Sequence, residues 1–244
     1  QAHFIYELLQ NADDVGATSA SFKLYEDKLV FIHNGSHHFF VSDPANERQD
    51  KANGKLGDIN SITSIGNSNK NAKIGKFGVG FKAVFQYTNT PQIYDPKFRF
   101  CIDRFIVPVP IDNDYPDRLP EETVFVFPFN HSEKTKEEAY ADIEEKLKTL
   151  KFPILFLSHL KYVSFEFADT LGLYGKDIDD DKSFVEDDIT AEYITLTHNV
   201  SDDLIDRNLW LFSRIYNLSD EHSEKYSVGF FLDENDKLIA TNEQ

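Results

Sequence analysis

Residues 75–81 constrain this chain more than any other segment. They read GKFGVGF, with glycines at 75, 78 and 80, and the apolar residues after them are spaced for the start of a helix. Glycines let backbone N–H groups approach phosphate oxygens closely, and a following helix adds the positive end of its dipole. The segment therefore predicts a phosphate-binding loop. A structural turn would use the same residues, and the Walker A pattern is missing, so this segment alone leaves both interpretations open.

A polar stripe on the first predicted helix indicates chemistry beside that loop. Apolar residues follow helical spacing over residues 4–12, whereas Glu7, Asn11 and Asp14 recur at i, i+4 and i+7. A carboxylate can act as general base for a water, and an amide oxygen one turn away can coordinate Mg²⁺. A solvated helix face is the alternative. Asp13 and Asp14 favour the functional interpretation, because the dipole disfavours anions at a helix C-terminus.

The rest of the chain is predicted to be rich in strands. Alternating apolar residues predict a hairpin over 20–24 and 29–32, and the polar stretch 34–74 is predicted to be a binding loop or lid. We expect a nucleotide-binding unit over 1–168, truncated at its N-terminus, and an acidic, strand-rich extension over 169–244, incomplete at its C-terminus. Further predicted elements are strands at 97–107 and 123–129, a helix at 139–150, strands at 154–157, 162–167 and 193–197, a solvated acidic loop at 177–181, and a hairpin of 226–232 with 238–240; residues 204–216 receive no assignment.

The charge balance restricts the partners of the chain. Lys and Arg total 25 against 42 Asp and Glu, a formal net charge of −17, which disfavours nucleic acid and anionic lipid. An anionic ligand would need a local site built from backbone amides, a helix N-terminus, a lysine or a bound cation. The sequence contains no run of about eighteen apolar residues, so it predicts no membrane-spanning helix. The single Cys101 cannot pair within the chain, which is typical of a reducing cytosol, so we expect a cytoplasmic protein.

Two ordered motifs resemble a known superfamily. Residues 7–14 (ELLQNADD) resemble the first motif of the GHKL ATPases, which include gyrase B, the ninety-kilodalton heat-shock chaperones, histidine kinases and MutL. Residues 75–81 resemble the glycine-rich motif of the chaperones. More narrowly, residues 3–14, 33–35, 64–70 and 75–85 resemble the sacsin-type branch, which includes sacsin repeats and plant proteins of the NO VEIN type. The resemblance covers about residues 1–168. It implies a Bergerat-type α/β fold: a two-layer sandwich of a mixed, mostly antiparallel sheet with helices on one face, and ATP held between the helices and a lid.

The resemblance also implies roles for single residues. Glu7 would position the attacking water, Asn11 would bind Mg²⁺, and Asp14 would support the base end of the pocket. The glycine-rich loop from Gly75 onward would hold phosphates, and Thr123 would lie near adenine through a water. The backbone amides that would contact phosphate belong to Gly78, Val79, Gly80 and Phe81, and Lys70 and Lys82 would be phosphate neighbours, although a surface lysine is the alternative for each.

The sequence departs from the superfamily at the base end of the site. Where most members have an Asp that accepts a hydrogen bond from the adenine amino group, this chain has His33, followed by Asn34 and Gly35. A neutral imidazole can accept one hydrogen bond, and Asn34 could use its carbonyl. Glu122 replaces the glycine that usually precedes Thr123. Adenine selectivity is therefore less secure than phosphate binding.

The motifs predict a Mg²⁺-dependent, slowly hydrolysing ATPase module. Nucleotide would close a lid over about residues 42–73 and change the shape of a larger chaperone-like, defence or quality-control protein. Its implied partners are ATP and ADP, other domains or proteins, and a second copy in a nucleotide-dependent dimer. The main alternative is a nucleotide-gated or nucleotide-blind scaffold in which His33 marks lost base recognition. A protein kinase is less favoured, because no phosphoacceptor histidine precedes the motifs.

Overall fold

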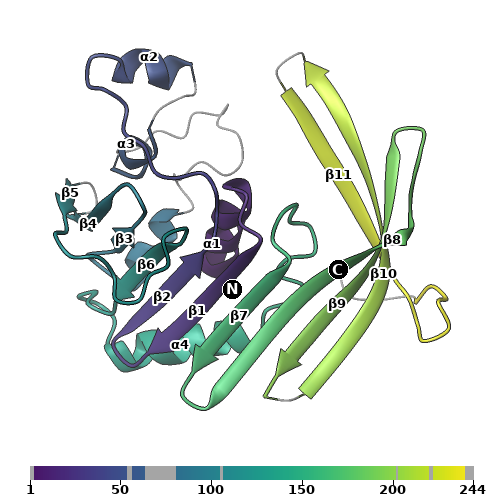
Figure 1. Cartoon of the computed structure of the whole chain (residues 1–244). Helices are drawn as coiled ribbons and strands as arrows, with labels where there is room; N and C mark the ends of the chain where they lie inside the picture. Colours follow the sequence, from purple (N-terminus) through teal and green to yellow (C-terminus); the bar gives the residue numbers. More distant parts are fainter. Residues whose placement is uncertain are drawn as a thin grey trace.

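The computed structural model describes residues 3–53, 57–63, 81–104, 107–201, 203–219 and 222–239. These residues form one sheet of eleven strands in the order β11-β10-β9-β8-β7-β1-β2-β6-β3-β4-β5 (Figure 1). Neighbouring strands pair antiparallel, except for β1 and β7, which are parallel. The expected mixed, mostly antiparallel sheet is confirmed, although the described chain contains few helices.

The helices and strands have the following bounds. The helices are α1 (His3–Asp14), α2 (Glu47–Ala52), α3 (Asp58–Thr63), the 3₁₀ helix η1 (Phe81–Gln86) and α4 (Lys136–Lys148). The strands are β1 (Ser19–Tyr25), β2 (Lys28–His33), β3 (Gln92–Tyr94), β4 (Arg99–Asp103), β5 (Val107–Pro110), β6 (Thr123–Pro128), β7 (Tyr162–Phe167), β8 (Thr170–Glu186), β9 (Ile189–Val200), β10 (Asp203–Ser219) and β11 (His222–Phe231). None of the helices in the described ranges is long and apolar enough to cross a membrane.

The first helix and the first hairpin match their predictions. The apolar side of α1 is buried, with Leu8 at 1% and Leu9 at 0% exposure. Gly16, at φ +77°, ends the helix, because this backbone conformation favours glycine. The N–H of Ala17 donates to the carbonyl of Ala12, and the N–H of Gly16 donates to that of Asp13, each at 2.9 Å. This pair of bonds is a Schellman motif, which turns the chain from α1 into β1.

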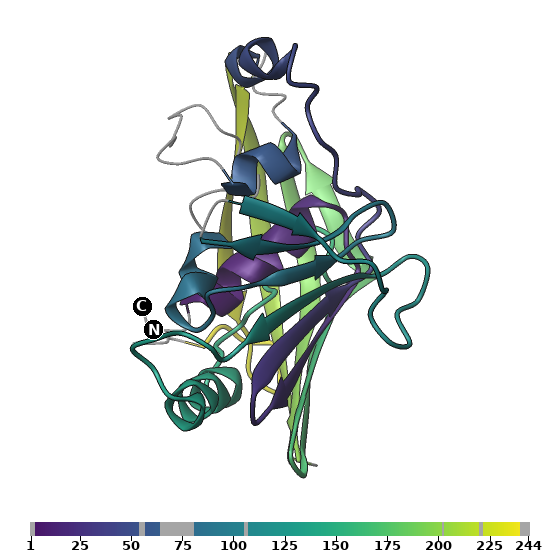
Figure 2. The same cartoon turned by 90° about the vertical axis from the view of Figure 1, so that its left-hand side faces the viewer.

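The main core lies between the helices and one face of the sheet. Figure 2 shows α1, η1 and α4 on the same side of the strands, and their apolar residues share one cluster with Phe31 and Phe125. Alternate residues of the same strands face the other way, where Val30 and Val124 pack beneath Tyr115. The site residues on β2 and β6 therefore face either the helices or this smaller cluster, according to their position in the strand.

The strands after β7 form a long extension of the same sheet. Residues 168 and 169, where the two predicted units meet, form the turn between β7 and β8, and pairing continues across it. The acidic segment 177–181 is not the expected loop but part of β8, with a register irregularity between Asp179 and Phe184. An exposed strand face accepts charged residues, so acidity alone did not exclude a strand. The unassigned residues 204–216 belong to β10.

Several other local expectations were wrong or only partly confirmed. The stretch 34–74 is not without secondary structure, because it contains α2 and α3. Residues 154–157 form turns rather than a strand; their apolar side chains Ile154 and Leu155 are buried, and burial in a turn gives the same short apolar pattern. The strand expected at 97–107 is divided between β4 and β5, and β3 was missed. Strand β11 pairs with β10, whereas residues 232 and 238 share only an isolated bridge.

Candidate functional site

The structure describes part of the predicted site. Glu7, Asn11 and Asp14 lie on α1, and His33 ends β2. Thr123 begins β6, Asn34 and Gly35 follow β2, and Phe81 and Lys82 begin η1. Lys70, Gly75, Gly78, Val79 and Gly80 lie outside the described residues. The structure therefore bears on the α1 side and the proposed base end, and the phosphate loop stays a prediction.

Strand pairing brings two of the predicted residues together. His33 and Thr123 are direct partners in the antiparallel pair of β2 and β6. Both occupy the helix-facing side of the sheet, because Phe31 and Phe125 lie two positions along each strand in the main core. The ring of His33 lies 5.9 Å from that of Phe31 and 5.7 Å from that of Phe125. The pair therefore lies at the end of an aromatic core.

The start of η1 packs against the same aromatic core. Phe81, the last residue of the glycine-rich segment, is 1% exposed, and its ring lies 6.0 Å from that of Phe125. Lys82, the next residue, is half-buried. The described end of the glycine-rich segment thus lies near the β6 strand that also carries Thr123.

The turn after β2 is bonded to the end of α1. Ser36 and His37 donate their N–H groups to the carbonyl of Val15 at 2.9 and 3.2 Å. A Cβ added at Gly35 would lie 2.4 Å from Val15 Cγ2, so only glycine fits this close approach. These contacts hold the His33 end of the site against α1.

Asn34 fixes this turn from the other side. Its Oδ1 accepts the N–H groups of Thr18 and Ser19 at 2.9 and 3.0 Å, and its Nδ2 donates to Thr18 Oγ1 at 2.9 Å. An amide oxygen has two lone pairs, and both are engaged here. The sequence suggested that this carbonyl could contact a base, but the structure uses it to join the turn to β1.

Asn11 is buried with an unused donor. Its side chain is 5% exposed, and its Nδ2 has no hydrogen-bond partner among the described residues. An unpaired buried N–H destabilises a fold by about 1–3 kcal/mol, so a native protein normally supplies an acceptor. Glu7 lies one turn earlier on α1 and is half-buried. The donor set fits a bound polar group: an acceptor near Nδ2 would satisfy it, and the Asn11 oxygen is a ligand type that Mg²⁺ accepts.

The described residues contain no cluster of three or more His, Cys, Asp or Glu side chains that could hold a metal. A cation at Asn11 would therefore depend on other oxygens. Mg²⁺ commonly binds in this way, with one protein ligand beside substrate phosphates and several waters.

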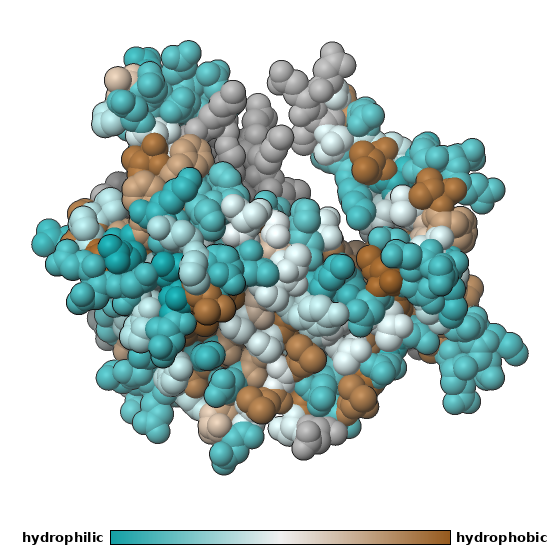
Figure 3. Space-filling view, viewed as in Figure 1, coloured by the Kyte–Doolittle hydropathy of each residue, from teal (hydrophilic) through white to brown (hydrophobic). Residues whose placement is uncertain are grey.

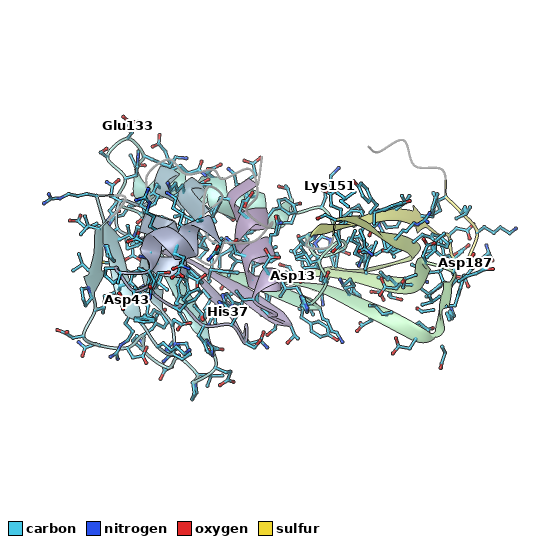
Figure 4. All side chains as sticks on the ribbon, turned by 90° about the horizontal axis from the view of Figure 1, so that it is seen from above. Asp13, His37, Asp43, Glu133, Lys151 and Asp187 are labelled. Carbon is cyan, nitrogen blue, oxygen red and sulfur yellow. The ribbon has the colours of Figure 1, made fainter. Side chains whose placement is uncertain are left out.

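The structure gives a reason for Asp13, one of the two acidic residues at the end of α1. It is 6% exposed, and its carboxylate accepts the N–H groups of Ser158, His159 and Leu160 at 2.9, 2.6 and 2.8 Å. The buried Lys176 donates to the carbonyl of Leu157 in the same loop. Figure 4 shows Asp13 between α1 and the strand extension. The reason for an acid at this helix end is therefore a long-range anchor, which sequence spacing could not reveal.

Asp14, the last residue of α1, is exposed, whereas Asn11 is buried. Partial burial of its carboxylate, with the negative charge of Asp13, raises the pKa of Asp14 to about 6, and His159 opposes this shift. Its side chain is exposed at the edge of an open hollow of about 460 Å³ between α1 and β11, which Lys225 and Tyr226 also line. Neither His33 nor Thr123 lines this hollow. The assigned role of Asp14 at the base end stays a prediction.

Thr123 belongs to a buried polar network that the sequence analysis missed. Its Oγ1 donates to Asp95 Oδ2 at 3.0 Å, and Asp95 is 1% exposed. Asp95 also accepts the N–H of Lys97 and lies 3.3 Å from His38 Nδ1. The only sequence signal was the Asp95-Pro96 pair, which is typical of a turn. Thr123 therefore has its proton committed to Asp95, and its remaining lone pairs are free to accept.

His33 has a defined hydrogen-bonding state. Its Nδ1 accepts the N–H of Gly35 at 3.1 Å, whereas its Nε2 is buried without a hydrogen-bond partner in the described part of the chain. Burial, followed by the nearby His38, lowers the pKa of His33 to about 3, so the ring is neutral at physiological pH. The sequence left open that this ring accepts a hydrogen bond from a base. Its acceptor nitrogen is instead occupied by the backbone.

The segment that carries α1, the β1–β2 hairpin and the turn after it lies within a match to a known domain family. Residues 1–104 match the family model of the Sacsin domain, and the predicted sacsin-type resemblance is confirmed. The N-terminal part of this chain is therefore similar to the Sacsin domain.

Two curated relatives lie in the same branch. Protein NO VEIN of Arabidopsis thaliana is 31% identical over 110 residues, which cover 42% of this chain and 3% of that protein. Sacsin of Homo sapiens is 33% identical over 112 residues, which cover 40% of this chain and 2% of that protein. The matched region is thus a very small part of each relative.

Proposed function

We propose that this chain is the Mg²⁺-dependent nucleotide-binding module of a larger chaperone-like protein, and that it hydrolyses nucleoside triphosphate slowly. ATP is the nucleotide that the resemblance implies. The observation that carries the proposal is Asn11, one turn after Glu7, which is 5% exposed and whose Nδ2 no described residue satisfies. A buried amide donor that no described residue satisfies, beside a carboxylate, is the arrangement expected of a site that binds a polar ligand.

The layered arrangement supports a Bergerat-type fold for this part of the chain. The helices α1, η1 and α4 cover one face of a mixed sheet, and nucleotide would lie between α1 and the segment that ends at Phe81. The turn after β2 and the start of β6 would close the base end of this nucleotide site. These are the elements on which the resemblance places the nucleotide contacts.

The chemistry assigned to the chain is limited and specific. Glu7 would take a proton from a water, whose oxygen then attacks the γ-phosphorus while the bond to the departing diphosphate oxygen breaks. Asn11 would contribute one oxygen to Mg²⁺, which neutralises triphosphate charge. Such a cation matters in a chain with a formal net charge of −17, because bare triphosphate would be repelled.

Two short helices, α2 and α3, support the lid proposed over about residues 42–73. Helix α2 has no buried residue, and it lies apart from the sheet at the top of Figure 1. The start of α3 is held more firmly: Gly57 donates its N–H to Ser42 Oγ at 2.8 Å, and Ser42 donates its own N–H to Asn60 Oδ1 at 3.0 Å. An anchored base with an exposed arm suits a segment that changes position when triphosphate binds.

The first prediction separates binding from hydrolysis. Glu7→Ala should bind Mg-nucleotide about as tightly as the parent but hydrolyse it about 10²–10⁴-fold more slowly, because the carboxylate acts on water. Asn11→Ala should instead weaken Mg²⁺-dependent binding. Calorimetric titration and phosphate release measure the two effects, and Glu26→Ala, an exposed change in the β1–β2 turn, is the matched control.

Parent-like turnover in Glu7→Ala would remove the catalytic assignment. If neither Mg-ATP nor Mg-GTP bound to the parent chain, the scaffold alternative would take its place. That alternative has its own support, because His33 replaces the usual Asp and the Asn34 carbonyl is already engaged.

A further inference from the structure

The buried imidazole of His33 presents a donor where the superfamily motif would present an acceptor. His33 is 3% exposed, and its position next to Thr123 places it at the base end of the proposed site. The inference that follows rests on the proposed function, and it concerns which base the site takes.

The protonation of the ring follows from one contact. The backbone N–H of Gly35 can only donate, and it lies 3.1 Å from His33 Nδ1. Nδ1 must therefore carry a lone pair, and the single proton of the neutral ring must be on Nε2. The turn that carries Gly35 is held in place, because the next two residues, Ser36 and His37, donate their N–H groups to the carbonyl of Val15.

The second nitrogen then requires an acceptor. Nε2 is buried and has no hydrogen-bond partner in the described residues, and its ring neighbours are Phe31 and Phe125. The buried Asp95 carboxylate accepts from Thr123 and Lys97, but no hydrogen bond joins it to His33 Nε2 in the described part of the chain. A buried donor left in this state is satisfied when a ligand supplies a carbonyl oxygen.

We propose that His33 Nε2 donates a hydrogen bond to the base, so that the site prefers 6-oxopurine nucleotides, with guanine or hypoxanthine, over adenine nucleotides. Position 6 of adenine carries an amino group, which would place one donor against another. The same position of a 6-oxopurine carries a carbonyl, which accepts. A site built to hydrogen-bond one group rejects the analogue with mismatched polarity strongly, because buried polar groups are then left unpaired.

The test compares three nucleotides on the whole chain. Calorimetric titration of the parent with the Mg²⁺ complexes of GTP, ITP and ATP should show GTP and ITP binding about 10-fold or more tightly than ATP, the effect of one buried hydrogen bond. ITP lacks the 2-amino group of guanine, so agreement between GTP and ITP assigns the preference to position 6.

Two substitutions reverse or remove the preference. His33→Asp supplies an acceptor and should favour ATP, whereas His33→Asn offers both a donor and an acceptor and should bring the three affinities within about 3-fold. The neutral Asn variant keeps the test valid if the Asp carboxylate destabilises the aromatic core. His37→Gln, a change at an exposed histidine four residues away, should leave the preference unchanged.

A spectroscopic measurement checks the donor itself. Nitrogen-15 NMR of the parent should show the Nε2–H form of His33 near neutral pH, and the Nε2–H resonance should shift with Mg-ITP more than with Mg-ATP. Tighter binding of ATP than of GTP and ITP would overturn the inference and leave the proposed function intact. Absence of binding by all three nucleotides would overturn both.

Discussion

The two parts of the sheet differ in how they are covered. From β1 to β6 the strands lie under α1, η1 and α4, and residues 123–127 of β6 are all buried. From β8 to β11 the strands are longer, yet their described cluster contains four buried strand residues, among them Leu209 and Leu211, together with Leu155 from the turn before β7. Figure 3 shows apolar side chains at the surface of this extension, between polar ones. One continuous sheet therefore contains a region that builds a core and a region that depends mainly on its own cross-strand contacts.

The cross-strand contacts of the extension are largely aromatic. The Trp210 ring lies 5.3 Å from that of Tyr193 and 5.8 Å from that of Phe184, and the Phe212 ring lies 5.9 Å from that of Phe230. Such pairs stabilise neighbouring strands without a second layer. The comparison indicates that the covered region suits a polar site, because among the described residues it buries two unpaired side-chain nitrogens of the predicted site, Asn11 Nδ2 and His33 Nε2.

The largest expected effect is a loss in the free energy of unfolding that differs between the covered region and the extension. Phe125→Ala should lower the free energy of unfolding by about 3–5 kcal/mol, because Phe125 is 1% exposed and its ring contacts Phe31, Phe81 and Phe127. Phe230→Ala should lower it by less than about 1 kcal/mol, because this ring is 45% exposed. Urea unfolding measures both. Equal losses would show that the extension is as strongly packed as the covered region.

A smaller effect concerns the contact between the regions. Asp13→Ala removes the acceptor of three N–H groups in residues 158–160 and should lower the free energy of unfolding by about 2–3 kcal/mol. Hydrogen exchange at residues 158–160 should accelerate more than exchange in β2. Unchanged exchange at these amides would mean that the loop is held by other contacts. Asp14→Asn, one residue further on, is the matched control for this local effect.

The smallest effect is a pH dependence at Asp14. Its pKa of about 6 in the folded chain exceeds the usual 3.8, so folding favours the protonated carboxyl. The stability contributed by this group is fully present below about pH 4 and is lost as pH rises through 6. Asp14→Asn should therefore become more stable than the parent across this interval, by less than about 1 kcal/mol, because the exposed side chain is screened by solvent. A constant difference from pH 4 to 7.5 would contradict the raised pKa.

Local patterns predicted the covered region better than the extension. Helix α1, the β1–β2 hairpin and α4 follow directly from apolar periodicity and from Gly16, because each closes through bonds between nearby residues. Strand β10 did not, because its exposed ends, residues 203–207 and 214–219, include both apolar and polar side chains without one buried face. Its pairing with β9 and β11, rather than its own pattern, makes it a strand.

The sequence by itself determined which chemical groups α1 and the turn after β2 carry: the acid and amide of Glu7 and Asn11, and a histidine in place of an aspartate. The tertiary structure decided which of their polar atoms are already in use. Asp13 is engaged with residues 145 to 147 positions away, and Asn34 with residues 15 and 16 positions away, so neither pairing is encoded in local spacing. Hydrogen-bond satisfaction depends on which distant groups a fold brings within about 3 Å. Among the described residues, no acceptor comes that close to Asn11 Nδ2 or His33 Nε2.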